Sequence, residues 1–195
     1  MNLAILLLAA GQSSRMRGAD KLLEPVEGKP IIEVMAGRAL EVSDAVYVTL
    51  PSLDHPRSEA LKGMTITPVP VPEAQEGMGA SIRAGIKALK GAPKGVMILP
   101  GDMPDLSASD LHHVAAQWQT SPQSILRGAS RDDLPGHPVI FPQRVFSRLA
   151  ELRGDRGARD ILSGEMITRV PLPGRNALTD LDTPEAWAAW RARNG

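Results

Sequence analysis

The sequence predicts an α/β fold with a mostly parallel central sheet. Short apolar segments alternate along the chain with segments whose apolar residues recur at helical spacing. A length of 195 residues fits one domain with a sizeable core. The loops richest in polar residues and glycine directly follow predicted strands, as in sheets whose working loops gather at the carboxyl ends of the strands. We therefore expect a single domain over residues 1–195, without a linker or an internal repeat.

The elements follow one another in order. Four short apolar runs in the first half are expected to be strands, at residues 3–8, 45–50, 64–69 and 95–99. Helices are expected between and after them, at residues 31–40, 56–61, 79–89 and 107–117. Ser107, with Asp110 three residues later, resembles a helix-start capping box. The less regular second half predicts strands at 124–127, 139–141 and 167–170 and helices at 144–152, 156–162 and from Pro184 to about 192.

Composition excludes several classes of function. Lys plus Arg and Asp plus Glu both number 22, so the formal net charge is zero and nucleic acid is not expected as a partner. The absence of cysteine removes disulfides, thiolate nucleophiles and cysteine-based metal sites. The apolar N-terminus lacks a preceding basic region and a cleavage site, and no run approaches the roughly 18 apolar residues of a membrane span. A cytoplasmic protein without membrane partners is expected.

The loop after the first predicted strand carries the most information. The strand breaks at Gly11 into a polar segment that contains two cations, Arg15 and Lys21. Such a loop places backbone N–H groups and fixed positive charge where phosphates can bind. It lacks the G-K-[ST] ending of a P-loop and the G-x-G-x-x-G spacing of a dinucleotide fold. An ordinary strand-to-helix connection with two solvated charges has the same spacing, so both interpretations stay open at this point.

A family resemblance favours the phosphate loop. The segment Leu8-Ala9-Ala10-Gly11-Gln12-Ser13-Ser14-Arg15-Met16, followed by Arg17-Gly18-Ala19-Asp20-Lys21, resembles the pattern L-A-[AG]-G-x-S-x-R-M-G-x-x-K of the molybdenum cofactor nucleotidyltransferases, the MobA-like NTP transferases. Arg17 stands where that pattern has glycine, which predicts an extra cation or a one-residue shift. The resemblance implies the Rossmann-like three-layer fold of nucleotide-diphospho-sugar transferases. It also implies nucleotide binding by Leu8, Ala9, Ala10, Gly11, Ser13, Ser14, Arg15 and Lys21, with Arg15, Lys21 and Asp102 as catalytic residues.

Two acidic elements are candidates for a Mg²⁺ site. Gly101-Asp102-Met103-Pro104 follows a predicted strand, and the resemblance implies that Asp102 holds the metal bound to the nucleotide phosphates. A turn aspartate that bonds its own backbone is the alternative. Asp180-Leu181-Asp182-Thr183-Pro184-Glu185 resembles a late family element, which implies Asp182 as second ligand and Asp180 as a weaker candidate. Without the resemblance, a helix start enriched in acids explains this segment. A shared ion requires the carboxylates of Asp102 and Asp182 to lie roughly 4–8 Å apart.

Further glycine-rich segments resemble family elements for the base and the acceptor. Gly77-Met78-Gly79-Ala80-Ser81-Ile82-Arg83 implies that Gly77, Met78 and Ser81 bind the base or ribose, whereas a plain helix start with Ser81 as a cap is the alternative. Leu134-Pro135-Gly136-His137-Pro138-Val139 and Gly154-Asp155-Arg156-Gly157-Ala158-Arg159 imply acceptor binding by His137, Asp155, Arg156 and Arg159. An ion pair between Asp155 and Arg159 at a helix start explains the second segment equally well.

The implied reaction is nucleotidyl transfer, which depends on positioning and charge stabilisation. A phosphate of the acceptor would attack the α-phosphorus of a nucleoside triphosphate, and pyrophosphate would leave with Lys21 and Mg²⁺ offsetting its charge. Ala10 resembles the cytidylyl branch, which implies CTP and molybdopterin, closest to CTP:molybdopterin cytidylyltransferase, with a molybdoenzyme or its chaperone as the implied partner class.

Several alternatives to this reaction remain. Within the same fold they are guanylyl transfer and nucleotidyl transfer to sugar, alditol or isoprenoid-precursor phosphates. A non-catalytic nucleotide-binding protein is a further alternative. A nicotinamide-dependent oxidoreductase is disfavoured, because the glycine fingerprint is missing and the segment 45–50 ends without an acid.

Overall fold

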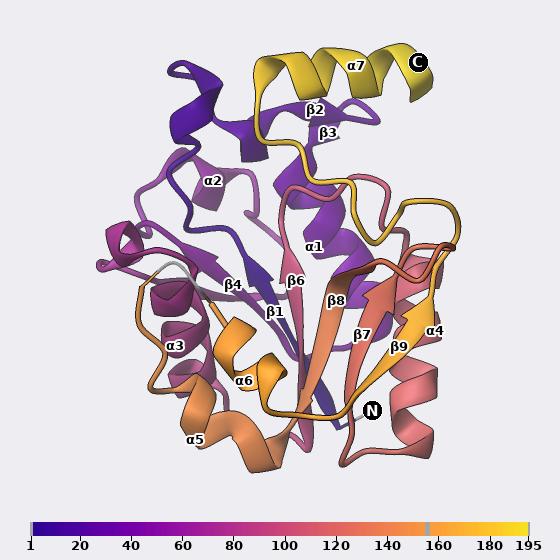
Figure 1. Ribbon diagram of the computed structural model, residues 1–195. Helices are drawn as coiled ribbons and strands as arrows, with labels where there is room; N and C mark the ends of the chain where they lie inside the picture. The colour runs from indigo at the N-terminus through magenta and orange to yellow at the C-terminus, as the bar shows by residue number, and fades with distance from the viewer. Residues whose placement is uncertain (1, 155–156, 195) are drawn as a thin grey trace.

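In the part of the chain that the structure describes, seven strands form the central sheet, in the order β5-β4-β1-β6-β8-β7-β9. The computed structural model describes residues 2–154 and 157–194 (Figure 1). β1 pairs in parallel with β4 and β6, whereas β8 runs antiparallel to its neighbours β6 and β7. The predicted mostly parallel sheet is therefore confirmed. Its strands are β1 (Leu3–Leu8), β4 (Val46–Leu50), β5 (Thr67–Pro70), β6 (Gly95–Pro100), β7 (Ile125–Ala129), β8 (Pro135–Pro142) and β9 (Ile167–Pro171).

Helices cover both faces of the sheet and complete a three-layer fold (Figure 1). Successive side chains of a strand point to opposite faces, so Leu3, Ile5 and Leu7 of β1 join the core beneath α1 and α4, while Ala4 and Leu6 join the core beneath α3, α5 and α6. The helices are α1 (Ile31–Val42), α2 (Pro56–Glu59), α3 (Met78–Ala88), α4 (Ala108–Thr120), α5 (Phe146–Leu149), α6 (Arg159–Ser163) and α7 (Pro184–Asn194). None of the helices in the described residues is long and apolar enough to cross a membrane.

The strand order reverses at β1. The chain leaves β1 through α1 to reach β4 and β5 on one side, and then returns through α3 to β6 on the other side. In open α/β sheets such a reversal leaves a crevice outside the carboxyl ends of the strands, where ligands bind. The loops after Leu8 of β1 and Pro100 of β6, two residues that face each other in the register, meet at this crevice.

Most predicted elements are present, with differences in extent at a few of them. The capping box is confirmed, because the hydroxyl of Ser107 accepts from the N–H of Asp110, whose carboxylate accepts from the N–H of Ser107. β8 is longer than predicted. Its first residues lack the apolar alternation that predicts a strand, but β8 is extended through them because it pairs with both β6 and β7. The predicted helix at 144–152 is reduced to a 3-10 turn and α5. A short hairpin, β2 (Pro25–Val26) with β3 (Lys29–Pro30), was not predicted.

Candidate active site

A cavity of about 460 Å³ opens at the crevice where the strand order reverses. Most of the residues predicted to bind the nucleotide line it, together with two of the predicted metal ligands. Those residues are Leu8, Ala10, Gly11, Ser13, Ser14, Arg15, Lys21, Gly77, Met78, Ser81, Asp102 and Asp182. Gln12, Leu22, Ala74, Gln75 and Pro100 also line the cavity and were not predicted. The structure thus brings five separate segments of the chain to one place.

The loop after β1 offers unpaired backbone donors to this cavity. Within the described residues, the N–H groups of Gly11, Gln12 and Ser13 have no hydrogen-bond partner in the protein. Gly11 does not have a positive φ, and a Cβ built on it would meet nothing within 4 Å. Gly11 is therefore not needed for a strained turn, and a larger side chain there would occupy ligand space instead. Successive unpaired N–H groups form an anion-binding surface.

Lys21 joins the two acidic segments. Its Nζ lies 2.5 Å from Oδ2 of Asp102 and 2.6 Å from Oδ1 of Asp182, so these oxygens are separated by no more than the sum of the two distances. The N–H of Leu181 donates to the backbone oxygen of Asp102 at 3.1 Å, which fixes the late segment against the loop after β6. Arg15 adds a second cation, 2.6 Å from the other carboxylate oxygen of Asp182. The expected proximity of the two acids is present.

Electrostatics favour the charged form of Lys21. Burial alone would lower the pKa of the ammonium, but the carboxylates of Asp102 and Asp182 outweigh that cost and raise it. The Lys21 side chain is only 17% exposed, so it is not the freely solvated loop cation that spacing alone would suggest. Asp180 does not line the cavity, and its pKa is raised by burial and then by the negative charges of Asp102 and Asp182.

Asp102 and Asp182 suit a divalent cation that takes its remaining ligands from phosphate oxygens and water. No group of three or more His, Cys, Asp or Glu residues with metal-binding geometry occurs in the part of the chain that the structure describes. Two carboxylates are nevertheless the donor set that suits Mg²⁺, which usually takes one or two of them plus phosphate oxygens and water. The site is therefore suited to a metal that arrives with a phosphate-bearing ligand.

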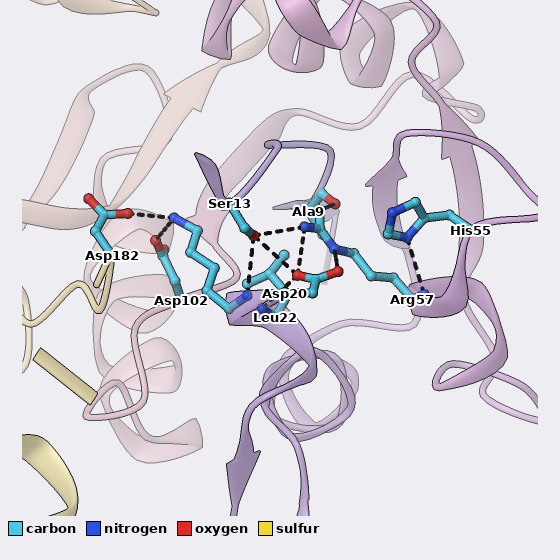
Figure 2. A network of polar contacts seen from close by, with 9 residues as sticks. Ala9, Ser13, Asp20, Leu22, His55, Arg57, Asp102 and Asp182 are labelled. Carbon is cyan, nitrogen blue, oxygen red and sulfur yellow. Dashed lines mark hydrogen bonds and ion pairs between the residues drawn. The ribbon is translucent and has the colours of Figure 1, made fainter. Parts of the chain in front are cut away.

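A buried arginine, Arg57, holds the loop after β1 in place (Figure 2). Its guanidinium, whose side chain is 2% exposed, forms a bidentate pair with Asp20 through two bonds of 2.7 Å. It also donates to the backbone oxygen of Ala9 at 2.6 Å and to the hydroxyl of Ser13 at 3.1 Å. Burial raises the pKa of Asp20, but the hydrogen bonds and charge of Arg57 prevail and lower it. One side chain from α2 thus connects the start, middle and end of the loop.

This network removes Ala9 from the predicted nucleotide contacts, and it gives the hydroxyl of Ser13, which still lines the cavity, a role within the loop. Ala9 is fully buried and does not line the cavity, because its N–H donates to the hydroxyl of Thr49 and its carbonyl accepts from Arg57. The hydroxyl of Ser13 bonds Asp20 and accepts from the N–H of Lys21, so it supports the loop. Sequence reasoning missed Arg57 and the role of Asp20. Asp20 stood inside the recognised pattern, but nothing local linked it to a charge 37 residues later.

The glycine-rich start of α3 packs against the segment around residue 154. The N–H of Gly79 donates to the backbone oxygen of Gly154 at 3.0 Å, and a Cβ on Gly79 would approach that oxygen to 2.7 Å. This N–H group is therefore unavailable to a ligand. Ser81 is buried and lines the cavity, and Met78 lies at its edge with 44% exposure.

Two of the predicted acceptor residues, His137 and Arg159, line a second, smaller cavity and do not line the nucleotide cavity. The other two, Asp155 and Arg156, fall outside the described residues. Arg17 adopts a left-handed conformation with φ of 53°, so it occupies the backbone position for which the family pattern has glycine. Its side chain pairs with Glu185 of α7 at 2.5 Å. Arginine in place of the family's glycine therefore adds a positive side chain that forms an ion pair with α7.

Fold and cavity together define an α/β protein with a ligand-sized cavity at the strand-order reversal, where open α/β sheets bind their ligands. The model of the MobA-like NTP transferase domain family matches residues 5–170, and the chain belongs to that family. It is 30% identical over 200 residues to the molybdenum cofactor guanylyltransferase of Yersinia pestis, covering 98% of this chain and 96% of that protein. It is 29% identical to the purine catabolism protein PucB of Bacillus subtilis, covering 92% and 91%.

Solved structures share the fold. Rv0371c from Mycobacterium tuberculosis superposes with a TM-score of 0.83 at 23% identity, covering 96% of each chain. CMP:2-keto-3-deoxy-manno-octonic acid synthetase in complex with CTP superposes with a TM-score of 0.75 at 16% identity, covering 98% of each chain. The family membership, together with the similarity to the guanylyltransferase of Yersinia pestis, identifies the protein as an enzyme of the nucleotidyltransferase type.

Proposed function

We propose that the enzyme transfers a nucleoside monophosphate from a triphosphate, GTP in the first instance, to a phosphorylated acceptor of the molybdopterin type, with release of pyrophosphate. The observation that carries the proposal is the position of Lys21. Its ammonium lies between Asp102 and Asp182, beside a loop in which three successive backbone N–H groups, at residues 11–13, have no partner in the described residues. This arrangement supplies donors, cations and metal-binding oxygens where a triphosphate would lie.

Each group then has a role in holding charge. The N–H groups of Gly11, Gln12 and Ser13 would bind phosphate oxygens, and Arg15 and Lys21 would stabilise the charge that develops on the leaving pyrophosphate. Asp102 and Asp182 would hold a divalent cation, which when bound neutralises phosphate charge. Mg²⁺ is the ion we propose, although Rv0371c was solved with manganese. Lys21 occupies the space between the two carboxylates, so it has to move when a cation binds both.

The choice of base follows the relatives more than the loop sequence. The cytidylyl interpretation of Ala10 is not supported by the relatives of known name, among them the guanylyltransferase of Yersinia pestis. Ala10 is 1% exposed and packs with Val71 and Ala80. Its methyl group would therefore affect the base through the position of α3, as well as by lining the cavity. CTP remains the second candidate on the strength of Ala10.

The test measures pyrophosphate release with each of the four triphosphates, with molybdopterin or a sugar phosphate as acceptor, and with Mg²⁺ or Mn²⁺. We expect activity with GTP and molybdopterin, which falls about 100-fold or more in Asp102→Asn and Asp182→Asn because a full charge is lost at the phosphates. Asp44→Asn is the control, since Asp44 is exposed and precedes β4 at the opposite end of the sheet. A preference for CTP would make CTP, and not GTP, the assigned nucleotide. Absence of turnover with every combination of triphosphate and acceptor would reject the transferase proposal.

A further inference from the structure

The loop after β1 contains a short 3-10 turn, Ser14–Met16, which ends at Arg17. Its backbone hydrogen bonds stay within the loop, at 2.9 Å between Met16 and Ser13 and at 3.1 Å between Ala19 and Met16. In the residues that the structure describes, no backbone hydrogen bond of this turn reaches another segment. The turn therefore depends on side chains for its position against the rest of the protein.

In the described part of the chain, two ion pairs join this turn to the C-terminal segment, residues 181–194. Arg15 pairs with Asp182 at 2.6 Å, and Arg17 pairs with Glu185, in the first turn of α7, at 2.5 Å. Both members of the first pair line the nucleotide cavity, whereas neither member of the second pair does. The two pairs are therefore in different surroundings, although their arginines are only two positions apart in the sequence.

Contacts other than these ion pairs hold α7 in place. The side chain of Trp187 is 1% exposed and belongs to the hydrophobic core. The indole N–H of Trp190 donates to the carboxylate of Asp105 at 2.7 Å, which connects α7 to the loop after β6. Figure 1 shows α7 at the same end of the molecule as the loop after β1, beyond the carboxyl ends of β1 and β6. Glu185 is thus a firm point of attachment for the turn.

The backbone of Arg17 is in a conformation that favours glycine. Its φ of 53° and ψ of 39° lie in the left-handed region, and the family pattern has glycine at this position. Non-glycine residues in such sparsely populated conformations cluster at active sites and ligand clamps. Glycine would adopt this conformation without steric cost, but it would remove the ion pair with Glu185. The strained arginine therefore points to a use for its side chain.

Binding of a triphosphate would change only the first of the two pairs. In the proposed function, Arg15 stabilises charge on the phosphates, so it leaves the carboxylate of Asp182. Arg17 and Glu185 do not line the cavity, so their ion pair stays intact during this exchange. The second pair is then the ionic contact that still connects the turn to the C-terminal segment.

We propose that Arg17 and Glu185 are positioning residues, which hold the turn against α7 and thereby keep Arg15 and the N–H groups of residues 11–13 at the triphosphate. This inference rests on the triphosphate site of the proposed function. Without a ligand, the turn is also held by the pair between Arg15 and Asp182, so loss of the exposed second pair has little effect on stability. With the ligand bound, the second pair acts alone, so its loss lowers the affinity.

The probe is GTP with a methylene group in place of its α,β-bridging oxygen, which binds without turnover, and the corresponding CTP analogue is titrated in parallel. Calorimetric titration with Mg²⁺ should show about three- to fivefold weaker binding in Glu185→Gln, with unchanged urea unfolding. The direction is diagnostic, because loss of a negative charge would by itself tighten binding of a triphosphate. Glu33→Gln is the matched control, since Glu33 is also an acid in the first turn of a helix, pairs with Lys29 and does not line the cavity.

Exchange of the two charges tests the ion pair itself. Arg17→Glu combined with Glu185→Arg should recover most of the affinity that Arg17→Glu alone loses. At about 0.5 M salt, the difference between wild type and Glu185→Gln should shrink, because the pair is exposed and screened.

Unchanged or tighter binding in Glu185→Gln, or no recovery in an exchanged pair that unfolds like wild type, would overturn the positioning role and leave the proposed function standing. Weaker binding in Glu185→Gln, in a protein that binds the analogue but shows no transfer, would support the positioning role and reject the proposed function. If the wild type binds neither analogue, both are overturned.

Discussion

Replacing Arg57 with methionine tests whether the loop after β1 depends on one buried cation. The substitution keeps an unbranched apolar stem in the buried space and removes the guanidinium. It deletes both 2.7 Å bonds to Asp20, the bond to the carbonyl of Ala9 and the bond to the hydroxyl of Ser13. Asp20 is then left as a half-buried carboxylate whose remaining partners are the N–H of Leu22 and the hydroxyl of Ser13.

The burial of the Arg57–Asp20 ion pair sets how much stability Arg57→Met should lose. Breaking a buried ion pair by removing one partner costs about 3–5 kcal/mol, and the 20% exposure of the Asp20 side chain places this pair near 3 kcal/mol. The unpaired carbonyl of buried Ala9 adds about 1 kcal/mol. A loss of about 3–4 kcal/mol lowers the melting temperature by about 6–16 °C in a domain of this length. Adding Asp20→Asn removes the uncompensated charge and should recover about 2 kcal/mol of that loss.

Urea unfolding gives the stability, and calorimetric titration with a triphosphate gives the affinity. We expect Arg57→Met to weaken triphosphate binding about tenfold or more, because Ser13 and the backbone of Lys21 lose their fixed position. Arg38→Met is the matched control for the loss of stability, since Arg38 is largely buried and donates to the carbonyls of Pro104 and Leu106 and not to the loop after β1. Loss of less than 1 kcal/mol in Arg57→Met, with unchanged affinity, would refute the role of Arg57.

The other predictions concern the same loop. Gly11→Val should keep the wild-type melting temperature and weaken triphosphate binding at least about tenfold, because its side chain meets only open cavity; normal affinity would place the phosphates elsewhere. Arg17→Gly should change the free energy of unfolding by less than about 1 kcal/mol, since relief of the left-handed φ offsets the exposed ion pair with Glu185. Asp20 has a folded-state pKa below its usual 3.8, so its contribution is complete above that pH and is lost as pH falls through the lowered pKa; urea unfolding of Asp20→Asn and wild type should converge there. Lys21→Ala should reduce kcat at least about 100-fold and also lower stability, and unchanged turnover would remove Lys21 from the mechanism.

Elements bounded by strong local signals could be predicted from sequence. β1 is an apolar run that ends three residues before Gly11, and β6 is one that ends at Pro100, and the observed bounds of both match the predicted ones to within one residue. α7 begins at Pro184 as expected, because proline is suited to the first turn of a helix. The proximity of Asp102 and Asp182 was expected from the family resemblance, which implies that both hold one cation, and the carboxyl edge of the sheet is where such segments can meet.

The features that sequence could not give depend on contacts between distant segments. Arg57 carries no local pattern, and only the packing of α2 against the loop makes it a partner of Asp20. Arg127 lies on a strand whose alternation does not distinguish a cavity-lining arginine from a solvated one. The second cavity exists because α6 packs over β6, β8 and β7.

The charges around Lys21 explain why the site should bind the divalent cation and the triphosphate together. Two acids, Asp102 and Asp182, are balanced by two cations, Lys21 and Arg15, so the site is close to neutral without a ligand. A divalent cation alone would have to displace the Lys21 ammonium and leave it without a carboxylate partner. A triphosphate alone would bring negative charge toward two acids. When both arrive, the metal takes the carboxylates and the phosphates take Lys21, so every charge keeps a partner. The geometry therefore favours binding of the metal and the triphosphate as one unit.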